Sequence, residues 1–380
     1  MKEERRKNRV VVAMSGGIDS SVAAALLKKQ GFSLIGAFMK FWASPERGGQ
    51  GEGWNRCCSL ESEKRARLVA KTLDIPFYVF NFEKEFKKRI VDYFLKEHGL
   101  GLTPNPCVVC NKEIKFGLLL EKALKLDADF IATGHYARII EDRPRQLIRQ
   151  IDPRPNPKLA RKTSDSIRLC QGKDKGKDQS YFLWQLDQKQ LNHILFPVGD
   201  YTKTQVRKLA KKFKLPVLNI PESQEICFIQ TSVGDFLSRH IKLRPGLVVD
   251  VKGKTLGHHQ GLSFYTIGQR KGIKLAGGPY YVLEKKLKKN ILVVTKNEKD
   301  LFRKEIMVKN VNWISGKEPK FPLKVKAKIR YRHKAEFAKI YKIQNTKYKI
   351  LFTKPQRAVT PGQSVVFYRK EELLGGGIIC

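Results

Sequence analysis

The sequence contains no run of eighteen apolar residues, so no segment is long enough to cross a membrane as a helix. Its opening stretch, MKEERRKNRVVVAM, begins with basic residues, but the apolar run that follows is five residues long. That run lacks the length and the small-residue cleavage site of a secretory signal. We therefore expect a globular cytoplasmic protein with no membrane partner.

Cysteine is also sparse. The chain has seven cysteines, an odd number, without the dense spacing of a secreted disulfide scaffold. At 380 residues it is long enough for two or three domains with their own cores, so folding requires neither a structural metal nor disulfides. In a reducing compartment a Cys-x-x-Cys pair indicates a metal site or chemistry rather than a cross-link.

Acidic residues are few relative to basic ones. The sequence holds 36 Asp and Glu against 75 Lys and Arg, which gives a formal net charge of +39. A field of this sign attracts polyanions, and nucleic acid is the commonest of them, through phosphate neutralisation. A lysine-rich composition shared across the organism's proteins is the alternative explanation.

An alternation of strand-like and helix-like segments occupies the first part of the chain. Short runs rich in Val, Ile and Phe, typical of buried parallel strands, lie at residues 9–14, 34–41, 77–82 and 130–135. The helix-like run SSVAAALLKKQG ends on Gly31, and residues 64–73 also show helical spacing. The pattern predicts a doubly wound parallel α/β sheet with its ligand site at the carboxyl ends of the strands.

In the rest of the chain the residue composition and the spacing of apolar residues change twice. Helical spacing returns in TKTQVRKLAKKFKLPV, where Pro216 ends the helix, and a Gly- and β-rich stretch follows residue 232. There, YYVLEKKLKKNILVVTK predicts a hairpin with its turn at Lys-Asn. Beyond residue 303, apolar and basic residues alternate as in a small antiparallel barrel.

These changes predict three domains. We expect an α/β domain at residues 1–232, a small central α+β domain at residues 233–303 and a C-terminal antiparallel β-barrel at residues 304–380. Residues 143–162 are proline-rich and basic, which predicts an exposed loop whose role the sequence does not define.

The segment SGGIDSS, residues 15–21, joins the first expected strand to the first expected helix. It is neither a Walker A loop nor a GxGxxG motif. Gly16 and Gly17 allow a tight turn whose N–H groups point inward, and the helix N-terminus favours an anion. The serines add hydroxyl donors, while Asp19 either holds Mg²⁺ or caps the helix. We therefore expect a phosphate or pyrophosphate site.

This loop resembles the SGGxDS loop of the PP-loop ATP pyrophosphatase superfamily, whose members split ATP into AMP and pyrophosphate to activate a carbonyl oxygen. The resemblance implies a nucleotide-binding set made of Ala13, Met14, Ser15, Gly16, Gly17, Ile18, Asp19 and Ser20. It also implies ATP and Mg²⁺ as cofactors.

A closer resemblance extends over nearly the whole chain. Blocks such as TPNPCVVCNKEIKF, TGHYAR, KDQSYFLWQL, SQEICFI, HHQGLSFYTIGQRKG and TPGQSVVFY are similar, in the same order, to the bacterial tRNA-uridine 2-sulfurtransferase family. The resemblance implies an adenine nucleotide alpha-hydrolase-like first domain. It also implies replacement of the C2 oxygen of the wobble uridine by sulfur, with tRNA and a sulfur donor or persulfide relay protein as partners.

Residue roles follow from the same resemblance. Cys110 would be the thiol that attacks a persulfide, Cys227 would carry the persulfide, and Met39 and Gly134 would line the nucleotide site. Contacts to the target base are implied for Asn105, Pro106 and Cys107. Contacts to the rest of tRNA are implied for His135, Lys177, Asp178, Gln179, Arg330, Tyr331 and Gln363. Lys112 and a helix starting just after Cys110 would lower the pKa of that thiol.

Cys107 is a departure from the family pattern, because members typically carry aspartate at this position. Cys107, Cys110 and Cys227 then supply three thiols to one expected site. Three thiolates with one open position suit a [4Fe-4S] cluster, whereas a persulfide relay would use Cys110 and Cys227 and leave Cys107 as a spare thiol. A structural zinc is the third option.

For the remaining cysteine and histidine pairs we expect structural roles. We expect packing or loop roles for the Cys57-Cys58 pair and no metal at the His258-His259 pair. Three rival functions stay open: an amidating PP-loop synthetase, an RNA-binding protein without activity, and a thiolase acting on another tRNA base.

Overall fold

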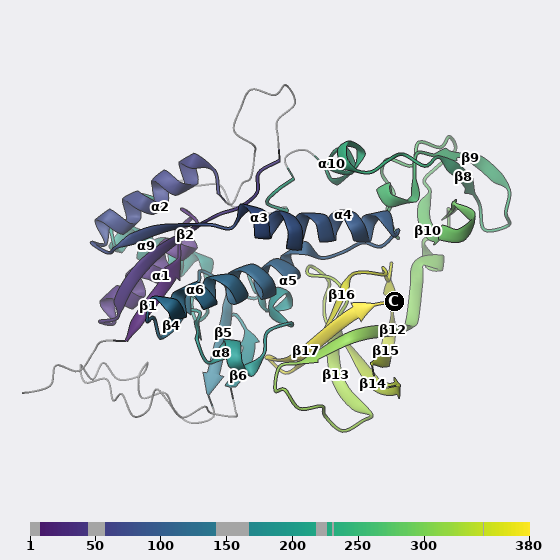
Figure 1. The fold of residues 1–380 in the computed structure, drawn as a ribbon. Coiled ribbons are helices and arrows are strands. Elements are labelled where there is room, and N and C mark those ends of the chain that lie inside the picture. Colours follow the sequence, from purple (N-terminus) through teal and green to yellow (C-terminus); the bar gives the residue numbers. More distant parts are fainter. Residues whose placement is uncertain (1–7, 45–57, 142–166, 218–225, 230–231, 345) are drawn as a thin grey trace, which may run out of the picture.

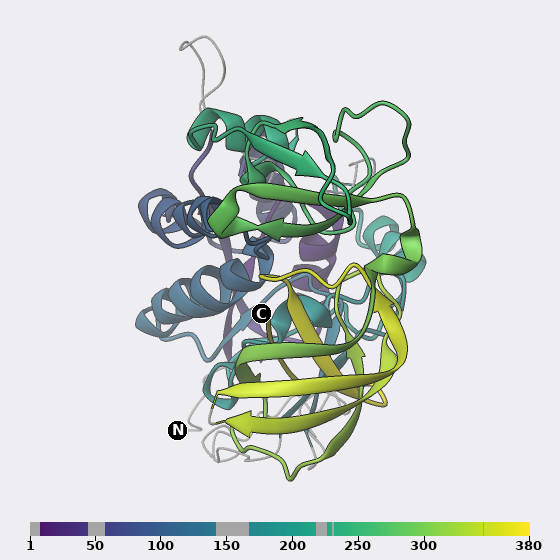
Figure 2. The same ribbon diagram turned by 90° about the vertical axis from the view of Figure 1, so that its right-hand side faces the viewer.

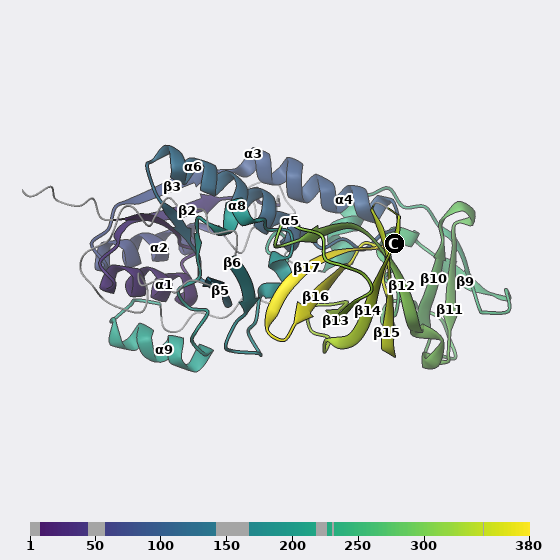
Figure 3. The same cartoon turned by 90° about the horizontal axis from the view of Figure 1, so that it is seen from below.

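The computed structural model describes residues 8–44, 58–141, 167–217, 226–229, 232–344 and 346–380. An α/β domain forms one end of the molecule, and a small central domain and a β-barrel lie at the other end (Figures 1 and 3). Viewed toward that second end, the central domain lies above the barrel and the α/β domain lies behind them (Figure 2).

A parallel sheet organises the α/β domain. Its strands are β1 (Arg9–Ala13), β2 (Ser33–Lys40), β3 (Phe77–Asn81), β4 (Phe130–Ala132) and β7 (Ile194–Leu195). They run parallel in the order β3-β2-β1-β4-β7, so the direction of winding reverses between β1 and β4. Such a reversal opens a crevice at the carboxyl ends of the strands. The predicted doubly wound sheet is confirmed.

Helices cover this sheet because their apolar faces need burial. α1 (Ile18–Lys29) buries Val22 completely, and Gly31 follows it at φ +84°, a conformation that suits glycine at a helix end. α2 (Leu60–Thr72) covers the predicted segment 64–73 up to residue 72 and starts earlier, where the side chain of Ser59 caps it. α9 (Lys203–Lys212) packs against α1.

Two longer helical segments extend from the sheet toward the other domains (Figures 1 and 3). The first consists of α3 (Glu83–Phe86), the π-helical turn η1 (Lys87–Val91) and α4 (Asp92–Gly99). The second consists of α5 (Pro106–Cys110), the π-helical stretch η2 (Asn111–Leu118) and α6 (Leu119–Lys125). π-Helical turns are uncommon and often accompany functional sites, and η2 begins directly after Cys110.

The central domain begins with α10 (Val233–His240), followed by β8 (Gly246–Val249), β9 (Thr255–His259), β10 (Tyr281–Lys286) and β11 (Ile291–Thr295). The sheet order is β10-β11-β8-β9. β10 and β11 form the predicted antiparallel hairpin, whose turn places Asn290 at φ +50°. The expected small α+β domain is confirmed.

The C-terminal barrel is built from β12 (Phe302–Trp313), β13 (Leu323–Lys328), β14 (Glu336–Gln344), β15 (Lys347–Arg357), β16 (Ser364–Arg369) and β17 (Glu372–Ile379). Antiparallel pairing runs β12-β15-β14-β13-β16-β17, and β12 also pairs with β17, which closes the barrel. Along β13 the apolar side chains are buried while lysines alternate outward, as the sequence pattern predicts, and β14 buries Ala338 and Ile340 in the same way.

A hairpin of the α/β domain joins the barrel sheet. β5 (Ala137–Glu141) and β6 (Ile167–Gln171) pair with each other, and β6 pairs with β17 through Cys170 and Glu372. Glu371 accepts from Arg138 and from Lys175, the latter at 2.7 Å. The sequence did not predict this attachment. The basic segment 143–162 and Cys57 lie outside the described residues.

Short helical turns complete the chain: η3 (Ser180–Leu183), α8 (Gln188–Leu191), η4 (Leu262–Phe264), η5 (Leu287–Lys289) and η6 (Glu298–Leu301). Within the part of the chain that the structure describes, no helix has the length and apolar character needed to span a bilayer.

Candidate active site

The phosphate loop lies at the winding reversal of the parallel sheet. β1 ends at Ala13. The main-chain N–H of Ser15, two residues later, donates to Ser20 Oγ at 3.2 Å. The hydroxyls of Ser20 and Ser21 donate to Gly17 O at 3.1 and 2.8 Å. These contacts fold the loop back onto the first turn of α1, with its N-terminus directed at the crevice.

Two glycines of the site are fixed by close packing. Gly16 has φ +72°, and a Cβ there would lie 2.2 Å from Ser62 O at the start of α2. A Cβ on Gly134, which follows β4, would lie 2.6 Å from Ser20 N. Any side chain at these two positions would therefore displace the loop or the helix beside it.

The structure brings the predicted nucleotide residues together. Ala13 pairs in register with Ala37 of β2, two residues before Met39, and Gly134 follows β4 on the other side of β1. Met39 and Gly134 are partly exposed, whereas Ala13, Met14 and Ile18 are buried. The loop from residue 13 to residue 20 is thus flanked by both residues at one edge of the sheet.

Asp19 does not cap α1 with its side chain. Its carboxylate accepts from Lys203 Nζ at 2.7 and 2.8 Å and from the hydroxyl of Tyr136 at 2.7 Å. Lys203 is 8% exposed, so this cation is held inside the crevice. Sequence reasoning missed both partners.

One signal in the sequence pointed to Lys203. Thr202 and Gln205 form a capping box that fixes the start of α9, so Lys203 occupies the first turn. A cation is electrostatically unfavourable there because the helix N-terminus carries partial positive charge. A lysine at this position therefore favours an anionic partner.

The predicted cysteines lie on a second part of the α/β domain. Asn105 caps α5 by accepting from Val108 N at 3.4 Å, and Pro106 occupies the first helical position. Cys107 is partly exposed and Cys110 is 8% exposed. Three residues apart on a helix, they share a face.

The expected helix start after Cys110 is wrong. The helix begins at Pro106, because Asn105 supplies the cap, so Cys107 and not Cys110 lies in the first turn. Any effect of the helix N-terminus on thiol chemistry therefore acts on Cys107.

Cys227 reaches the same hydrophobic core as Cys110. Cys110 is part of this core, and Cys227 packs against it. The next residue, Phe228, anchors the segment: its ring lies 5.9 Å from Phe86, 5.6 Å from Phe94 and 5.5 Å from Phe236, between ring centroids. Among the described residues no group of three His, Cys, Asp or Glu side chains is arranged to hold a metal ion.

Cys58 carries the packing role expected for it. Its sulfur accepts from Phe41 N at 3.2 Å, and Cys58 directly precedes Ser59, the cap of α2. The thiol therefore ties the start of α2 to the end of β2.

Several residues predicted to contact tRNA have roles inside the protein. Asp178 is 4% exposed, and its carboxylate accepts from Gly172 N and Ser180 N, both at 3.1 Å. Gln179 Oε1 accepts from Tyr136 N at 3.0 Å. Lys177, beside them, is partly exposed.

His135 is also buried, at 9% exposure. Its Nδ1 lies 2.7 Å from Thr133 Oγ1, and its ring packs against Phe116 and Phe196. Burial, with a smaller contribution from Lys115, lowers the pKa of His135 well below its ordinary value. The imidazole is therefore neutral at physiological pH, and an ion pair between it and a phosphate is not expected.

Tyr331 lies next to the helix that carries Cys107 and Cys110. Its ring centroid is 4.5 Å from that of Phe182 and 6.1 Å from that of Tyr181, and Lys328 Nζ lies 5.4 Å from its centre. Asn111, the residue after Cys110, donates to Phe182 O at 3.2 Å. The barrel thus presents a partly exposed aromatic ring with a nearby cation beside the predicted thiols, a combination suited to stacking a base.

A doubly wound sheet, a phosphate loop at its winding reversal and an appended barrel define a PP-loop nucleotide-binding protein with additional domains. Family models match each part: a tRNA methyl transferase HUP domain at residues 8–231, a tRNA methyl transferase PRC-barrel domain at 234–296 and an aminomethyltransferase beta-barrel domain at 303–379. The chain belongs to the family of the tRNA-specific 2-thiouridylases.

Individual relatives support this assignment along the whole length. The chain is 47% identical over 376 residues to a protein from Thermoanaerobacter sp. (strain X514) named tRNA-specific 2-thiouridylase MnmA 2, covering 98% of both chains. It is 43% identical over 377 residues to tRNA-specific 2-thiouridylase MnmA of Carboxydothermus hydrogenoformans, with the same coverage. A relative of the same name from Clostridium perfringens is 45% identical.

Proposed function

We propose that this protein is an ATP-dependent tRNA-uridine 2-sulfurtransferase that converts the wobble uridine of tRNA to 2-thiouridine. The observation that carries the proposal is the packing of Ala13, Cys110 and Cys227 around one core, which brings the phosphate loop and two thiols into one domain. The family relationship supports the same conclusion. We also propose that the reaction takes place in the cytoplasm, where tRNA is used in translation.

The first half of the reaction activates the base. Uracil C2 is a poor electrophile, so its oxygen must first become a leaving group, which transfer of AMP from ATP achieves with release of pyrophosphate. Ser15, Gly16, Gly17 and Ser20 would hold the phosphates through main-chain N–H groups and hydroxyls. Lys203, held 2.7 Å from Asp19, places a cation beside the same loop.

Mg²⁺ fits this site as an ion shared between one protein carboxylate and the substrate phosphates. The described residues offer no cage of protein ligands, and Asp19 already accepts from Lys203 and Tyr136. Mg²⁺ is commonly held by one or two carboxylates together with substrate phosphates. Asp19 would supply that carboxylate, and the ion would screen the phosphate charge.

The second half transfers sulfur. A persulfide on Cys227 adds its terminal sulfur to C2, and AMP leaves with the former C2 oxygen. The Cys110 thiolate then attacks Cys227 Sγ, which breaks the S–S bond, releases 2-thiouridine and leaves a Cys110–Cys227 disulfide. An external thiol reductant must reduce that disulfide, and a persulfide donor must reload Cys227.

The alternative is a [4Fe-4S] cluster held by Cys107, Cys110 and Cys227. Among the described residues no three potential ligands form a group that could hold a metal ion, so the arrangement does not fit this cluster. We therefore assign no step to a cluster, and we propose that Cys107 contributes to binding the target base together with Asn105 and Pro106.

The direct test is product analysis. Purified protein is incubated with ATP, Mg²⁺, a persulfide donor and an unmodified tRNA transcript whose anticodon begins with uridine. Mass spectrometry of the digested tRNA should show one sulfur at the wobble position, with one pyrophosphate released per sulfur. Sulfur at another base would assign the protein to a different thiolation, and pyrophosphate release without sulfur would favour another PP-loop reaction.

A further inference from the structure

The loop between β15 and β16, residues 358–363, contacts all three domains, and we call it the junction loop. It belongs to the barrel, where Ile379 N donates to Gln363 O at 2.9 Å, and Ala358 N donates to Leu301 O, directly before β12, at 2.9 Å. From there it reaches both the central domain and the segment that precedes the predicted catalytic helix.

Hydrogen bonds tie the junction loop to residues Thr103 and Pro104. Thr103 N donates to Pro361 O at 3.0 Å. Gln363 Nε2 donates to Thr103 O at 2.8 Å and to Pro104 O at 3.3 Å, across 260 residues of sequence. A glutamine amide has two N–H donors, so both are used here, and only Oε1 remains for another partner.

The contact is also sterically tight. Gly362 has φ +91°, and a Cβ at this position would lie 2.9 Å from Thr103 N and 3.0 Å from Leu102 Cβ. The two backbones therefore meet without an intervening side chain. Gly362 N in turn donates to Ile379 O at 2.9 Å, so a displacement of the loop would disturb the end of β17 as well.

Arg330 fixes the loop from the other side. Its Nη2 atom lies within donating distance of Ala358 O at 2.8 Å, Thr360 Oγ1 at 2.6 Å and Ile267 O of the central domain at 3.2 Å. Thr360 is 2% exposed. The guanidinium group thereby connects the junction loop to the central domain.

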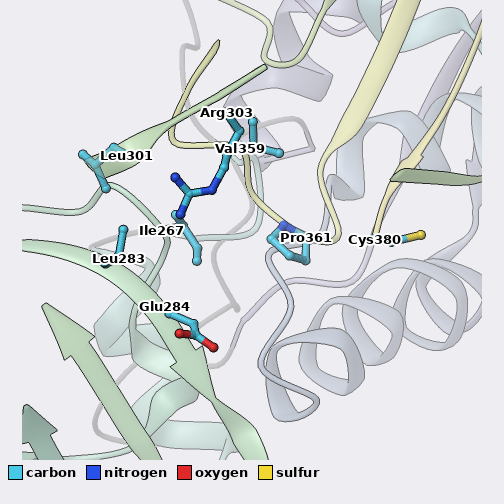
Figure 4. Close-up of a pocket in the computed structure, with 8 residues that line it drawn as sticks. All are labelled: Ile267, Leu283, Glu284, Leu301, Arg303, Val359, Pro361 and Cys380. Carbon is cyan, nitrogen blue, oxygen red and sulfur yellow. The ribbon is translucent and has the colours of Figure 1, made fainter. Parts of the chain in front are cut away.

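Packing alone does not hold the loop in place. A cavity of about 230 Å³ lies between the central domain and the barrel, and Val359 and Pro361 form part of its wall opposite Ile267 and Leu283 (Figure 4). Because this side of the loop faces open space, the side-chain hydrogen bonds of Gln363 and Arg330 add to the main-chain contacts that hold the loop in position.

We propose that Gln363 is a positioning residue: acting from the barrel, it fixes Thr103 and Pro104 and thereby the start of the helix that carries Cys107 and Cys110. Asn105, the cap of that helix, directly follows Pro104. The inference rests on the proposed function for its role in catalysis, and it differs from the expectation that Gln363 serves as a tRNA contact.

The experiment compares Gln363→Met, which keeps the side-chain length and removes both donors, with Gln356→Met. Gln356 is a matched control because its amide donates only locally, to Lys354 O at 2.8 Å. Three quantities are measured: the dissociation constant for unmodified tRNA, the single-turnover rate of 2-thiouridine formation at saturating tRNA, and the rate of Cys110 alkylation by iodoacetamide without tRNA.

For Gln363→Met we expect the saturated rate to fall at least about tenfold, because small misplacements of reacting groups are costly. The dissociation constant should stay within about twofold of wild type, and Cys110 alkylation should rise at least about threefold as the helix start loosens. Gln356→Met should match wild type in all three measurements.

A raised dissociation constant with an unchanged saturated rate would make Gln363 a tRNA contact and overturn the inference. Unchanged alkylation, or an unchanged rate, would overturn it equally. If wild type forms no 2-thiouridine, the proposed function fails, while the alkylation comparison still tests the positioning. Gln363→Glu, which turns an oxygen toward the two carbonyls, replaces Gln363→Met if circular dichroism shows that variant to be unfolded.

Discussion

Lys203 and Asp19, 184 residues apart in the chain, form an ion pair beside the phosphate loop, with Lys203 Nζ 2.7 Å from Asp19 Oδ1. The lysine side chain is 9% exposed and the aspartate 32%. In the proposed reaction this pair would exchange partners, with the lysine facing a phosphate and the carboxylate facing Mg²⁺.

Lys203→Met should raise the KM for ATP at least about tenfold, because the Asp19 charge would then face the phosphates unbalanced. Tyr136 would remain as its hydrogen-bond donor. The measurement is tRNA-dependent pyrophosphate release as a function of ATP concentration. Lys208→Met, which alters an exposed lysine on the same helix, is the control and should leave KM unchanged. An unaltered KM in Lys203→Met would remove this residue from the nucleotide site.

Asp19→Ala should abolish pyrophosphate release. The substitution removes the anion that holds both Lys203 and Tyr136, and with it the carboxylate proposed for Mg²⁺. Asp92→Ala is a suitable control, since Asp92 pairs with Lys87 at the surface, away from the loop. Normal pyrophosphate release from Asp19→Ala would contradict the assignment of the phosphate loop.

Cys110→Ser and Cys227→Ser should each lower sulfur transfer by at least about 10³-fold while adenylation continues, because a hydroxyl cannot carry or cleave a persulfide. Nucleoside mass spectrometry and pyrophosphate release separate the two half-reactions. Cys58→Ser, at a thiol bonded to the main chain of Phe41, should retain sulfur transfer. Retained sulfur transfer in either variant would refute the roles assigned to Cys110 and Cys227.

The persulfide route predicts an iron-free active enzyme. Protein purified without oxygen should show neither absorption near 400 nm nor stoichiometric iron and sulfide, since a relay through Cys110 and Cys227 uses no cluster. It should still form 2-thiouridine from a persulfide donor. Stoichiometric iron, together with activity that is lost when Cys107→Ala removes the iron, would replace the persulfide route by a cluster.

Stability should fall on acidification because of His98, whose Nδ1 lies 3.1 Å from Ser263 O at the contact between α4 and the central domain. The pKa of His98 is lowered from 6.5 to about 4, mainly by burial; the Ser263 hydrogen bond opposes this lowering and Lys285 adds a smaller lowering. The unfolded chain therefore binds a proton at higher pH than the folded protein does. Stability is complete above about pH 6.5 and declines toward pH 4.

The test for His98 is the melting temperature between pH 7 and pH 4.5. Wild type should lose stability across this window, and His98→Gln should lose less, because its amide does not titrate. His240→Gln, at a histidine bonded within its own helix to Phe236 O, is the comparison. Parallel melting curves for wild type and His98→Gln would rule out the contribution.

The local pattern of apolar residues was sufficient to predict much of the fold. The strands β1 to β3 were predicted within two residues, because continuous Val, Ile and Phe runs are specific to buried parallel strands. The β10–β11 hairpin was predicted for a similar reason. The attachment of β6 to β17 was not, because it depends on a single register pair, Cys170 with Glu372, set by the tertiary fold.

The site shows the same limit. The loop from Ser15 to Ser20 was recognised from sequence, whereas its ion pair with Lys203 requires two distant segments to meet. The sequence also does not distinguish a polar residue that faces solvent from one that is buried with hydrogen-bond partners. Asp178 is the clearest case, because its carboxylate organises its own loop. Domain boundaries at 232/233 and 303/304 and the individual tRNA contacts stay predictions.

The contact between Gln363 and Thr103 also has a consequence during protein synthesis. Ribosomes add roughly 5–20 residues per second, so the 260 residues that separate the two take between about 13 and 50 seconds to appear. During that interval the nascent chain contains the helix that carries Cys107 and Cys110, but it lacks the barrel residue that bonds Thr103. With the positioning role proposed for Gln363, the start of the helix that carries Cys107 and Cys110 would be fixed only late in translation, when the barrel closes.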